Sequence, residues 1–477
     1  MPFSIDNAVR PLEPLVAVDD RPLLLKGGTI ISMDEQVGDL AEGDILIEGS
    51  RIAAIGASLR CDDAEIVDVS GMILIPGFVD CHRHAWEAPL RHLNPNSSNL
   101  LDYCCATHFT FGPHYRPIDI YAGTLLTAIS GIDTGITTFI DNCHNARSDD
   151  HAAAGLAAWQ HSGVRALFAP GPPLTGAWDE AGWPAHRLAE LATRLGPETP
   201  ERLVELGLMA QLLPDVWAQA RAMGLPIVSE IPAPELADAI RKLAADGELG
   251  PDNIFNHITA LPADVLALLC EAGVRTNVCP RSDAQYGIGD GGMRAFQAAL
   301  DAGLEPGFSI DNETSYSGDM FGEMRTEFFL QRAMAQRDRF GGAKGVPPLT
   351  IRQVLKAATI DGARCAGLDD RCGSLVPGKQ ADLIMIRATD INLHPVSNAF
   401  GAVVQGADRG NIDSVLIGGR FCKRHGQIRG LDQGKLMSLV TATQTYLFAA
   451  HGYKPDLFCD THDSLGREFP ELTRFWN

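Results

Sequence analysis

The sequence has little positive charge and no cysteine pattern typical of a metal site or a disulfide framework. It carries 39 lysine and arginine residues against 60 aspartate and glutamate residues, a formal net charge of -21. A nucleic-acid binder needs a basic surface that displaces counterions from phosphates, so this class is disfavoured. The 11 cysteines contain no CxxC spacing, and Cys104 and Cys105 are adjacent. We therefore expect free thiols and a cytoplasmic protein.

Long apolar runs are also missing. The first twenty residues lack the hydrophobic stretch of a signal peptide, and nothing in the chain reads as a membrane span. Internal repeats and low-complexity segments are absent too. With 477 residues, 45% hydrophobic and 21% charged, the chain has the composition of an ordinary globular protein. Its length suits a barrel of about 250 residues plus a second unit.

Short strands separated by glycine and aspartate occupy residues 22–76, a pattern typical of antiparallel β structure. Similar short strands return after residue 372. We expect residues 1–74 and 373–430 to form one small β-sandwich domain from both ends of the chain. The tail, 431–477, reads as a partly helical extension.

Between these segments, residues 75–372 alternate apolar runs of strand length with helical stretches, which is typical of parallel βα units. The predicted fold class is therefore α/β, a (β/α)8 TIM-like barrel with the small β-sandwich beside it. An eighth strand, less visible, is expected near 205–213. The other seven are predicted at 73–80, 136–141, 165–169, 226–229, 253–256, 275–278 and 306–310.

Two histidines, His82 and His84, follow the first predicted barrel strand. In an extended segment residues i and i+2 point to the same side, so both imidazoles can face one point at the mouth of the barrel. Neutral imidazole is a good ligand for zinc or iron. Two surface histidines in a loop are the alternative, and this motif alone does not decide between them.

Two further polar residues follow later strands. His257 comes after 253–256, and Asp311 comes after 306–310. Each has a simple structural explanation, a loop histidine or a helix N-cap. Four such residues at the ends of barrel strands nevertheless favour a metal site.

Four segments resemble the signatures of the amidohydrolase superfamily, closest to its cytosine deaminase-like and triazine chlorohydrolase-like branch. Residues 76–84 (PGFVDCHRH) are similar to its PGFVDxHxH signature. Residues 279–282 (CPRS) are similar to its CPRSN-type segment. Residues 309–325 resemble its strand-eight segment, and 373–383 (GSLVPGKQADL) its return to the β domain.

The resemblance implies a mononuclear metal centre, with one divalent ion: zinc first, iron or manganese as alternatives. It implies hydrolysis of a small, often heterocyclic substrate at a carbon bearing an amino or halide group. Members of the family often form homo-oligomers, so the resemblance implies one here as well. Asp311 would be the base, and His257 would contact the attacking water, the substrate or, as an alternative to Glu230, the metal. Further candidate substrate contacts, each with an equally simple structural explanation, are Trp86, His114, His144 and Arg281.

The chain departs from the family at strand five, which usually supplies a further histidine ligand. No histidine occurs between His186 and His257, and the segment 226–230 reads PIVSE. Glu230 is the strongest ligand nearby; it would complete a set with His82, His84 and Asp311, or, if free of metal, act as a proton donor. No lysine lies between Lys26 and Lys242, and Lys242 itself falls in a helical stretch. A pair of metals bridged by a lysine is therefore excluded.

We therefore predict a metal-dependent amidohydrolase that removes ammonia or a related leaving group by means of a metal-activated water. The alternative is a barrel with a lyase, cyclase or non-catalytic binding role, because one expected ligand is missing. Metal content distinguishes the two predictions.

Overall fold

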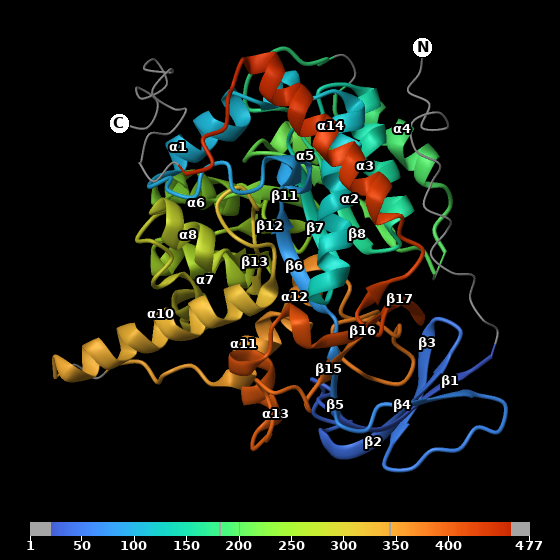
Figure 1. Ribbon diagram of the computed structural model, residues 1–477. Helices are drawn as coiled ribbons and strands as arrows, with labels where there is room; N and C mark the ends of the chain where they lie inside the picture. Colours follow the sequence, from blue (N-terminus) through green and yellow to red (C-terminus); the bar gives the residue numbers. More distant parts are fainter. Residues whose placement is uncertain (1–20, 181–182, 200, 343–344, 459–477) are drawn as a thin grey trace.

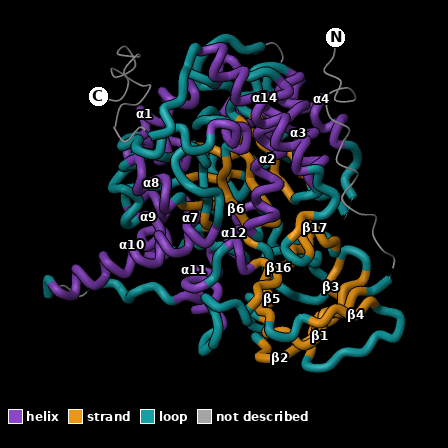
Figure 2. The backbone as a smooth tube through the Cα atoms, in the orientation of Figure 1, coloured by secondary structure: helices purple, strands orange, loops and turns teal. Residues whose placement is uncertain are grey.

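The computed structural model describes residues 21–180, 183–199, 201–342 and 345–458 (Figure 1). Strands gather in two places, a central group enclosed by helices and a second group at the lower right of Figure 2. The second group contains strands from both sides of the barrel segment, in residues 23–76 and 383–428. The expected contribution of both ends to one β unit is therefore observed, although the boundaries predicted at 74 and 372 stay predictions.

The β unit is one mixed sheet of nine strands, in the order β18-β17-β16-β15-β5-β1-β2-β3, with β4 paired to β1. Its two halves join where β15 pairs antiparallel with β5. The inward faces bury an aliphatic core that includes Leu25, Ile45, Leu74 and Leu383. The strands are β1 (Leu23–Ile30), β2 (Leu40–Glu48), β3 (Arg51–Gly56), β4 (Glu65–Asp68), β5 (Met72–Pro76), β15 (Leu383–Arg387), β16 (Ile412–Ile417), β17 (Arg420–Arg424) and β18 (Gln427–Ile428).

The central strands are parallel and close into a barrel. They pair in two runs, β6-β7-β8-β9 and β10-β11-β12-β13-β14. The two runs join at Gly207, between β9, which pairs with β8, and β10, which pairs with β11. Gly207 N bonds Phe168 O, and Leu208 N bonds Pro226 O. A parallel bridge between Arg83 and Asp311 closes the ring. The strands are β6 (Phe78–Arg83), β7 (Ile136–Cys143), β8 (Arg165–Pro170), β9 (Val204–Leu206), β10 (Leu208–Met209), β11 (Ile227–Glu230), β12 (Asn253–Asn256), β13 (Arg275–Val278) and β14 (Gly307–Phe308).

The strand predicted at 73–80 is two strands. β5 belongs to the β unit and β6 to the barrel, with Gly77 between them. Pro76 has no amide hydrogen to extend a ladder, and a Cβ on Gly77 would lie 2.1 Å from Thr137 Oγ1. The chain therefore changes sheets at this point. As a result His82 lies within β6, and His84 follows its end by one residue.

Helices surround the barrel, and α14 (Gln433–His451) lies across its helical layer (Figure 1). Thr443 Oγ1 donates to Asp119 Oδ1 of α2 over 2.8 Å, which anchors this helix. The tail is thus helical up to residue 451, while 459–477 lie outside the described residues. The other α-helices are α1 (Leu100–Cys104), α2 (Pro117–Thr134), α3 (Asp149–Ser162), α4 (Ala185–Leu195), α5 (Pro214–Arg221), α6 (Ala237–Ala245), α7 (Ala263–Glu271), α8 (Pro280–Tyr286), α9 (Ala295–Asp301), α10 (Met320–Phe340), α11 (Ile351–Ala357), α12 (Ile360–Ala366) and α13 (Ala399–Gly401).

Two expectations from composition concern the chain as a whole. The ten cysteines within the described residues are free thiols. Among the described helices none combines the length and apolar character needed to cross a membrane.

A buried ion pair joins the barrel to the β unit. Arg165, at the start of β8, donates from Nε to Asp382 Oδ2 over 2.8 Å, and its Nη2 reaches Gln380 Oε1 at 2.5 Å. Both charged side chains are about 1% exposed. Removing one partner of such a pair leaves the other charge buried and uncompensated.

We expect Arg165→Met to lower the free energy of unfolding by about 3–5 kcal/mol, because Asp382 loses its buried counter-charge. Chemical denaturation followed by circular dichroism measures this. Arg241→Met is the control, since its pair with Asp264 is exposed and such pairs contribute about 0–1 kcal/mol. Equal effects of the two substitutions would contradict the prediction.

Candidate metal centre and active site

His82, in β6, and His84, directly after it, are buried at the carboxyl end of the barrel. His82 is 0% and His84 6% exposed, and their rings meet edge to face with centroids 4.6 Å apart. His84 Nδ1 donates to the backbone carbonyl of Asn142 over 3.0 Å, so Nε2 is the nitrogen available to bind a metal. The side-chain amide of Asn256 lies 3.1 Å from His82 Nδ1 and holds that ring in place.

Asp311 faces both histidines from the end of the last strand. Its Oδ1 lies 3.3 Å from His82 Nε2 and 3.2 Å from His84 Nε2. Its backbone has φ +71, a left-handed conformation that is unfavourable for aspartate and typical of functional sites. Hydrogen bonds to β6 maintain it, since Asp311 N donates to His82 O and His84 N donates to Asp311 O.

These three side chains fit a divalent metal. His82 Nε2 and Asp311 Oδ1 are buried and have no hydrogen-bond partner, a costly arrangement unless another group binds them. With metal–ligand bonds of about 2.0–2.2 Å, ligand atoms in a tetrahedral site lie roughly 3.2–3.6 Å apart. The separations of 3.2 and 3.3 Å fall in this range.

Glu230, at the end of β11, lies on the other side of His82. Its Oε2 is 3.5 Å from His82 Nε2 and 3.5 Å from His257 Nε2. Its Oε1 accepts a hydrogen bond of 2.8 Å from Asn142 Nδ2. Burial raises the pKa of Glu230, but His82 and the other imidazoles outweigh it, and the net pKa lies below its ordinary value. Glu230 is therefore an anion that faces the candidate metal position.

Two further residues of β11, Ile227 and Ser229, offer no ligand to the candidate metal position. Ile227 is fully buried in the apolar core. Ser229 Oγ donates to the carbonyl of Ala210 over 2.6 Å. Of β11, only Glu230 presents a metal-binding group to the site.

His257 completes the group and has a carboxylate behind it. It is 5% exposed, with φ +66, and its Nδ1 lies 2.8 Å from Asp283 Oδ1. Burial disfavours the charged imidazole, yet the pKa of His257 is raised well above its usual value. Cys279 lies nearby, but burial also raises the pKa of that thiol. Burial raises the pKa of Asp283 as well, but the charge of His257 opposes that rise, so the close ion pair between Asp283 and His257 supports the raised pKa of the imidazole.

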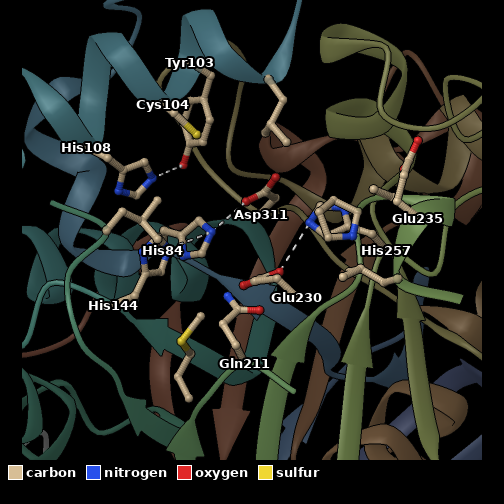
Figure 3. A pocket seen from close by; sticks show the side chains of 16 residues that line it. His84, Tyr103, Cys104, His108, His144, Gln211, Glu230, Glu235, His257 and Asp311 are labelled. Carbon is tan, nitrogen blue, oxygen red and sulfur yellow. Dashed lines mark hydrogen bonds and ion pairs between the residues drawn. The ribbon is translucent and has the colours of Figure 1, made fainter. Parts of the chain in front are cut away.

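A cavity of about 660 Å³ opens onto this cluster. In Figure 3, His84, His108 and His144 form one wall, His257 and Glu235 lie opposite, and Asp311 and Glu230 lie between. The cavity is also lined by four apolar side chains, Leu100, Leu174, Met209 and Leu236, and by the polar side chains of Tyr103 and Gln211. Its size suits a small organic substrate.

Two imidazoles of this wall, His108 and His144, are neutral. They stack at a centroid distance of 4.5 Å, and burial lowers the pKa of His144 strongly and that of His108 to about 3. Behind them, burial raises the pKa of Glu87 to about 8. Tyr103 Oη lies 2.8 Å from Glu87 Oε1. His108 and His144 can therefore exchange hydrogen bonds with a substrate without presenting a charge.

The predicted substrate contacts have different surroundings. His144 lines the cavity, and its Nε2 lies 3.3 Å from His84 Nε2. Trp86 is fully buried and packs edge to face on Tyr115. Arg281 is bound to Glu323, and His114 lies near His451. These last three are not among the lining residues, and their role as substrate contacts stays a prediction.

Sequence reasoning missed several residues of the site. His108 and Tyr103 lie in the long segment after β6, which carries no recognisable motif. Asn142 and Asn256 occupy strand ends, the position that identified His257, but asparagine was not considered as a support for ligands. Asp283 directly follows the CPRS segment, where the family signature has asparagine, and this departure was the available signal.

Residues 217–422 match the model of the amidohydrolase family. This range contains Glu230, His257 and Asp311, so the part of the chain that carries these residues is similar to the family that the motifs predicted. A 5-methylthioadenosine/S-adenosylhomocysteine deaminase of Pelotomaculum thermopropionicum is 27% identical over 87% of this chain and 96% of its own. A 5'-deoxyadenosine deaminase of Methanothermobacter thermautotrophicus is 26% identical over 90% of this chain and 100% of its own.

Solved structures confirm the barrel fold. An adenosine deaminase of Xanthomonas campestris with bound zinc superposes with a TM-score of 0.77 at 20% identity, over 90% of this chain and 98% of its own. An atrazine chlorohydrolase of Arthrobacter aurescens complexed with zinc gives 0.76 at 20% identity, over 88% of this chain and 100% of its own. The predicted (β/α)8 fold class is thus confirmed.

Replacing His82 or His84 should remove the metal. We expect His82→Ala and His84→Ala to contain less than about a tenth of the zinc of the unmodified protein, because each substitution removes one of the two imidazoles of the predicted ligand set. Elemental analysis of purified protein measures this, with His161→Ala as a control outside the site. Full metal content in His82→Ala would contradict the assignment of the site.

Metal affinity should also rise with pH. Burial disfavours the imidazolium of His84, but the hydrogen bond and charge of Asp311 raise its pKa to about 9 in the metal-free protein. Below that pH the metal must displace a proton, so affinity should increase by up to about tenfold per pH unit and level off near pH 9. Chelator competition between pH 6.5 and 9.5 tests this. An affinity that is constant over this range is the contrary result.

Proposed function

We propose that this protein is a zinc-dependent hydrolytic deaminase whose substrates are adenosine-type nucleosides modified at the 5' position. The observation that carries the proposal is the convergence of His82 Nε2 and Asp311 Oδ1, buried and unpartnered, on one point beside a cavity of about 660 Å³. Both curated relatives described above are named as deaminases of adenosine derivatives. The neutral imidazoles of His108 and His144 fit an uncharged heterocycle.

The proposed metal ligands are His82, His84, Asp311 and Glu230. Glu230 would take the place of the strand-five histidine, which makes the ligand set two imidazoles and two carboxylates. When bound, a divalent metal supplies Lewis-acid chemistry that lowers the pKa of water enough for attack near neutral pH. The alternative without hydrolysis loses its main motivation if Glu230, whose Oε2 lies 3.5 Å from His82 Nε2, serves as the missing ligand.

The chain's own residues would move the protons. Asp311 has Oδ1 directed at the two histidines, and Ser282 Oγ donates to Oδ2. Asp311 accepts a proton from the attacking water at Oδ2 while the water oxygen bonds to the carbon that bears the amino group. The same carboxyl then returns that proton to the amino nitrogen. The C–N bond breaks, ammonia leaves, and the carbon keeps the oxygen.

His257 would stabilise the charge that develops during this attack. Its Nε2 faces the cavity beside Glu230, 3.5 Å from Oε2. A donor held in place before the reaction costs no reorganisation in the transition state, which is why such groups contribute strongly to rate. We include in the proposal the cytoplasmic location and the homo-oligomer expected from sequence; the free thiols support the first.

The zinc-loaded protein should release ammonia from 5'-deoxyadenosine or 5'-methylthioadenosine and convert the purine to its 6-oxo form. Loss of absorbance near the adenine maximum, together with ammonia detection, measures this. Chloro-substituted triazines serve as the comparison, since a structural neighbour acts on atrazine. No ammonia from any purine nucleoside, with zinc bound, would refute the proposal.

Asp311→Asn separates proton transfer from folding. We expect kcat for deamination to fall by about 10²–10⁴-fold, because the amide cannot accept the proton. Asp301→Asn, in the last turn of α9, is the matched control and should retain full activity. If Asp311→Asn kept more than about a third of kcat, Asp311 would not be the base.

A further inference from the structure

The first turn of α8 touches both reacting groups of the barrel mouth. Ser282 donates to Asp311 Oδ2, and the next residue, Asp283, lies 2.8 Å from His257 Nδ1. The turn is tied to α10, since Arg281 Nε and Glu323 Oε1 are paired. One short segment therefore supports Asp311 on one side and His257 on the other.

Asp283 departs from the resemblance on which the segment was recognised. The CPRSN-type signature has asparagine after the serine, and this chain has aspartate. The side chain is 0% exposed, and its ion pair within the described part of the chain is with His257. Its second oxygen, Oδ2, is buried without a hydrogen-bond partner. A buried carboxylate is costly unless a partner compensates it, so the contact with His257 is strongly enforced.

We infer that Asp283 is a positioning residue for the reaction, whose carboxylate keeps a proton on His257 Nδ1 and thereby directs His257 Nε2 into the cavity beside Glu230. The inference deepens the proposed function and rests on it for the kinetic consequence. The geometric part stands on the 2.8 Å contact, the burial of both side chains, and the 3.5 Å approach of His257 Nε2 to Glu230 Oε2 in the cavity lining.

A carboxylate at position 283 fixes the proton on His257 Nδ1, whereas an asparagine there would not. An ionised carboxylate is only an acceptor, so the imidazole nitrogen that faces it must carry the proton. An amide can present either its oxygen or its NH2 group, and the NH2 group would accommodate a ring with the proton on the opposite nitrogen. Asp283 therefore excludes the tautomer in which Nδ1 is unprotonated.

The test uses the full-length, zinc-loaded protein labelled with ¹⁵N in its histidine rings, and Asp283→Asn as the near-isosteric variant. In the unmodified protein we expect His257, identified by loss of its signals in His257→Gln, to show a proton on Nδ1 with a downfield resonance. In Asp283→Asn this resonance should disappear. The kcat for deamination should fall at least about 100-fold, with KM within about threefold and zinc content unchanged.

Asp413→Asn is the matched control. Asp413 is a buried carboxylate of β16 that pairs with Arg387, outside the cavity lining, and we expect its removal to leave the His257 resonance and kcat unaltered. If Asp413→Asn changed both as strongly as Asp283→Asn, a general effect of buried charge would replace the inference.

Three results would overturn the inference. One is an unmodified protein in which His257 Nδ1 lacks a proton. Another is an Asp283→Asn protein that keeps the downfield resonance and a kcat within about threefold. The third is a loss of zinc in parallel with kcat, which would show a purely structural role. If Asp283→Asn failed to fold, the spectrum of the unmodified protein would still show whether His257 Nδ1 carries the proton. Because the spectra need no substrate, failure of the proposed deaminase activity is distinguishable from failure of this inference.

Discussion

The site depends on the closure of the barrel between its first and last strands. Asp311 N bonds the carbonyl of His82, His84 N bonds the carbonyl of Asp311, and Asp80 Oδ1 accepts a hydrogen bond from Ile310 N. These bonds bring residues more than two hundred positions apart into one register. Without them the HxH pair would be two buried histidines and Asp311 an ordinary strand-end carboxylate.

Beneath the site, a chain of buried charges holds β6 rigid. Arg83 lies between the two histidines in sequence and on the opposite side of the strand. Its Nε donates to Asp80 over 2.7 Å, and its Nη1 donates to Glu313 over 2.9 Å. Arg91 pairs with the other oxygen of Glu313. Such networks contribute little net stability, but breaking one partner is expensive, so they fix the direction in which His82 and His84 point.

Much of this arrangement was predictable from sequence, and the reasons for the remainder are physical. His82, His84, His257 and Asp311 were recognised because parallel strands share one edge, so that strand ends meet regardless of loop conformation. Glu230 was found because no competing ligand lies near it in sequence. The division of 73–80 into two strands was not predicted, because the apolar run is continuous across the Pro76–Gly77 break.

The walls of the cavity were not predictable in the same way. His108 and Tyr103 reach the site from a long segment after β6, where neither periodicity nor a motif determines the path of the chain. Their contacts with Glu87 depend on burial, which sequence does not show for an isolated glutamate. Asp283 was overlooked because a family signature directs attention to matching residues, whereas the informative feature was a mismatch.

The composite sheet also has a consequence for the order in which the chain can assemble. β5 pairs with β1 on one edge and with β15 on the other, so its second edge has no partner until residues 383–387 have been synthesised. An unpaired, apolar strand edge is prone to association with other chains. During translation the whole barrel therefore emerges before this edge of β5 acquires its partner. The edge is protected from association with other chains only after β15 has paired with it.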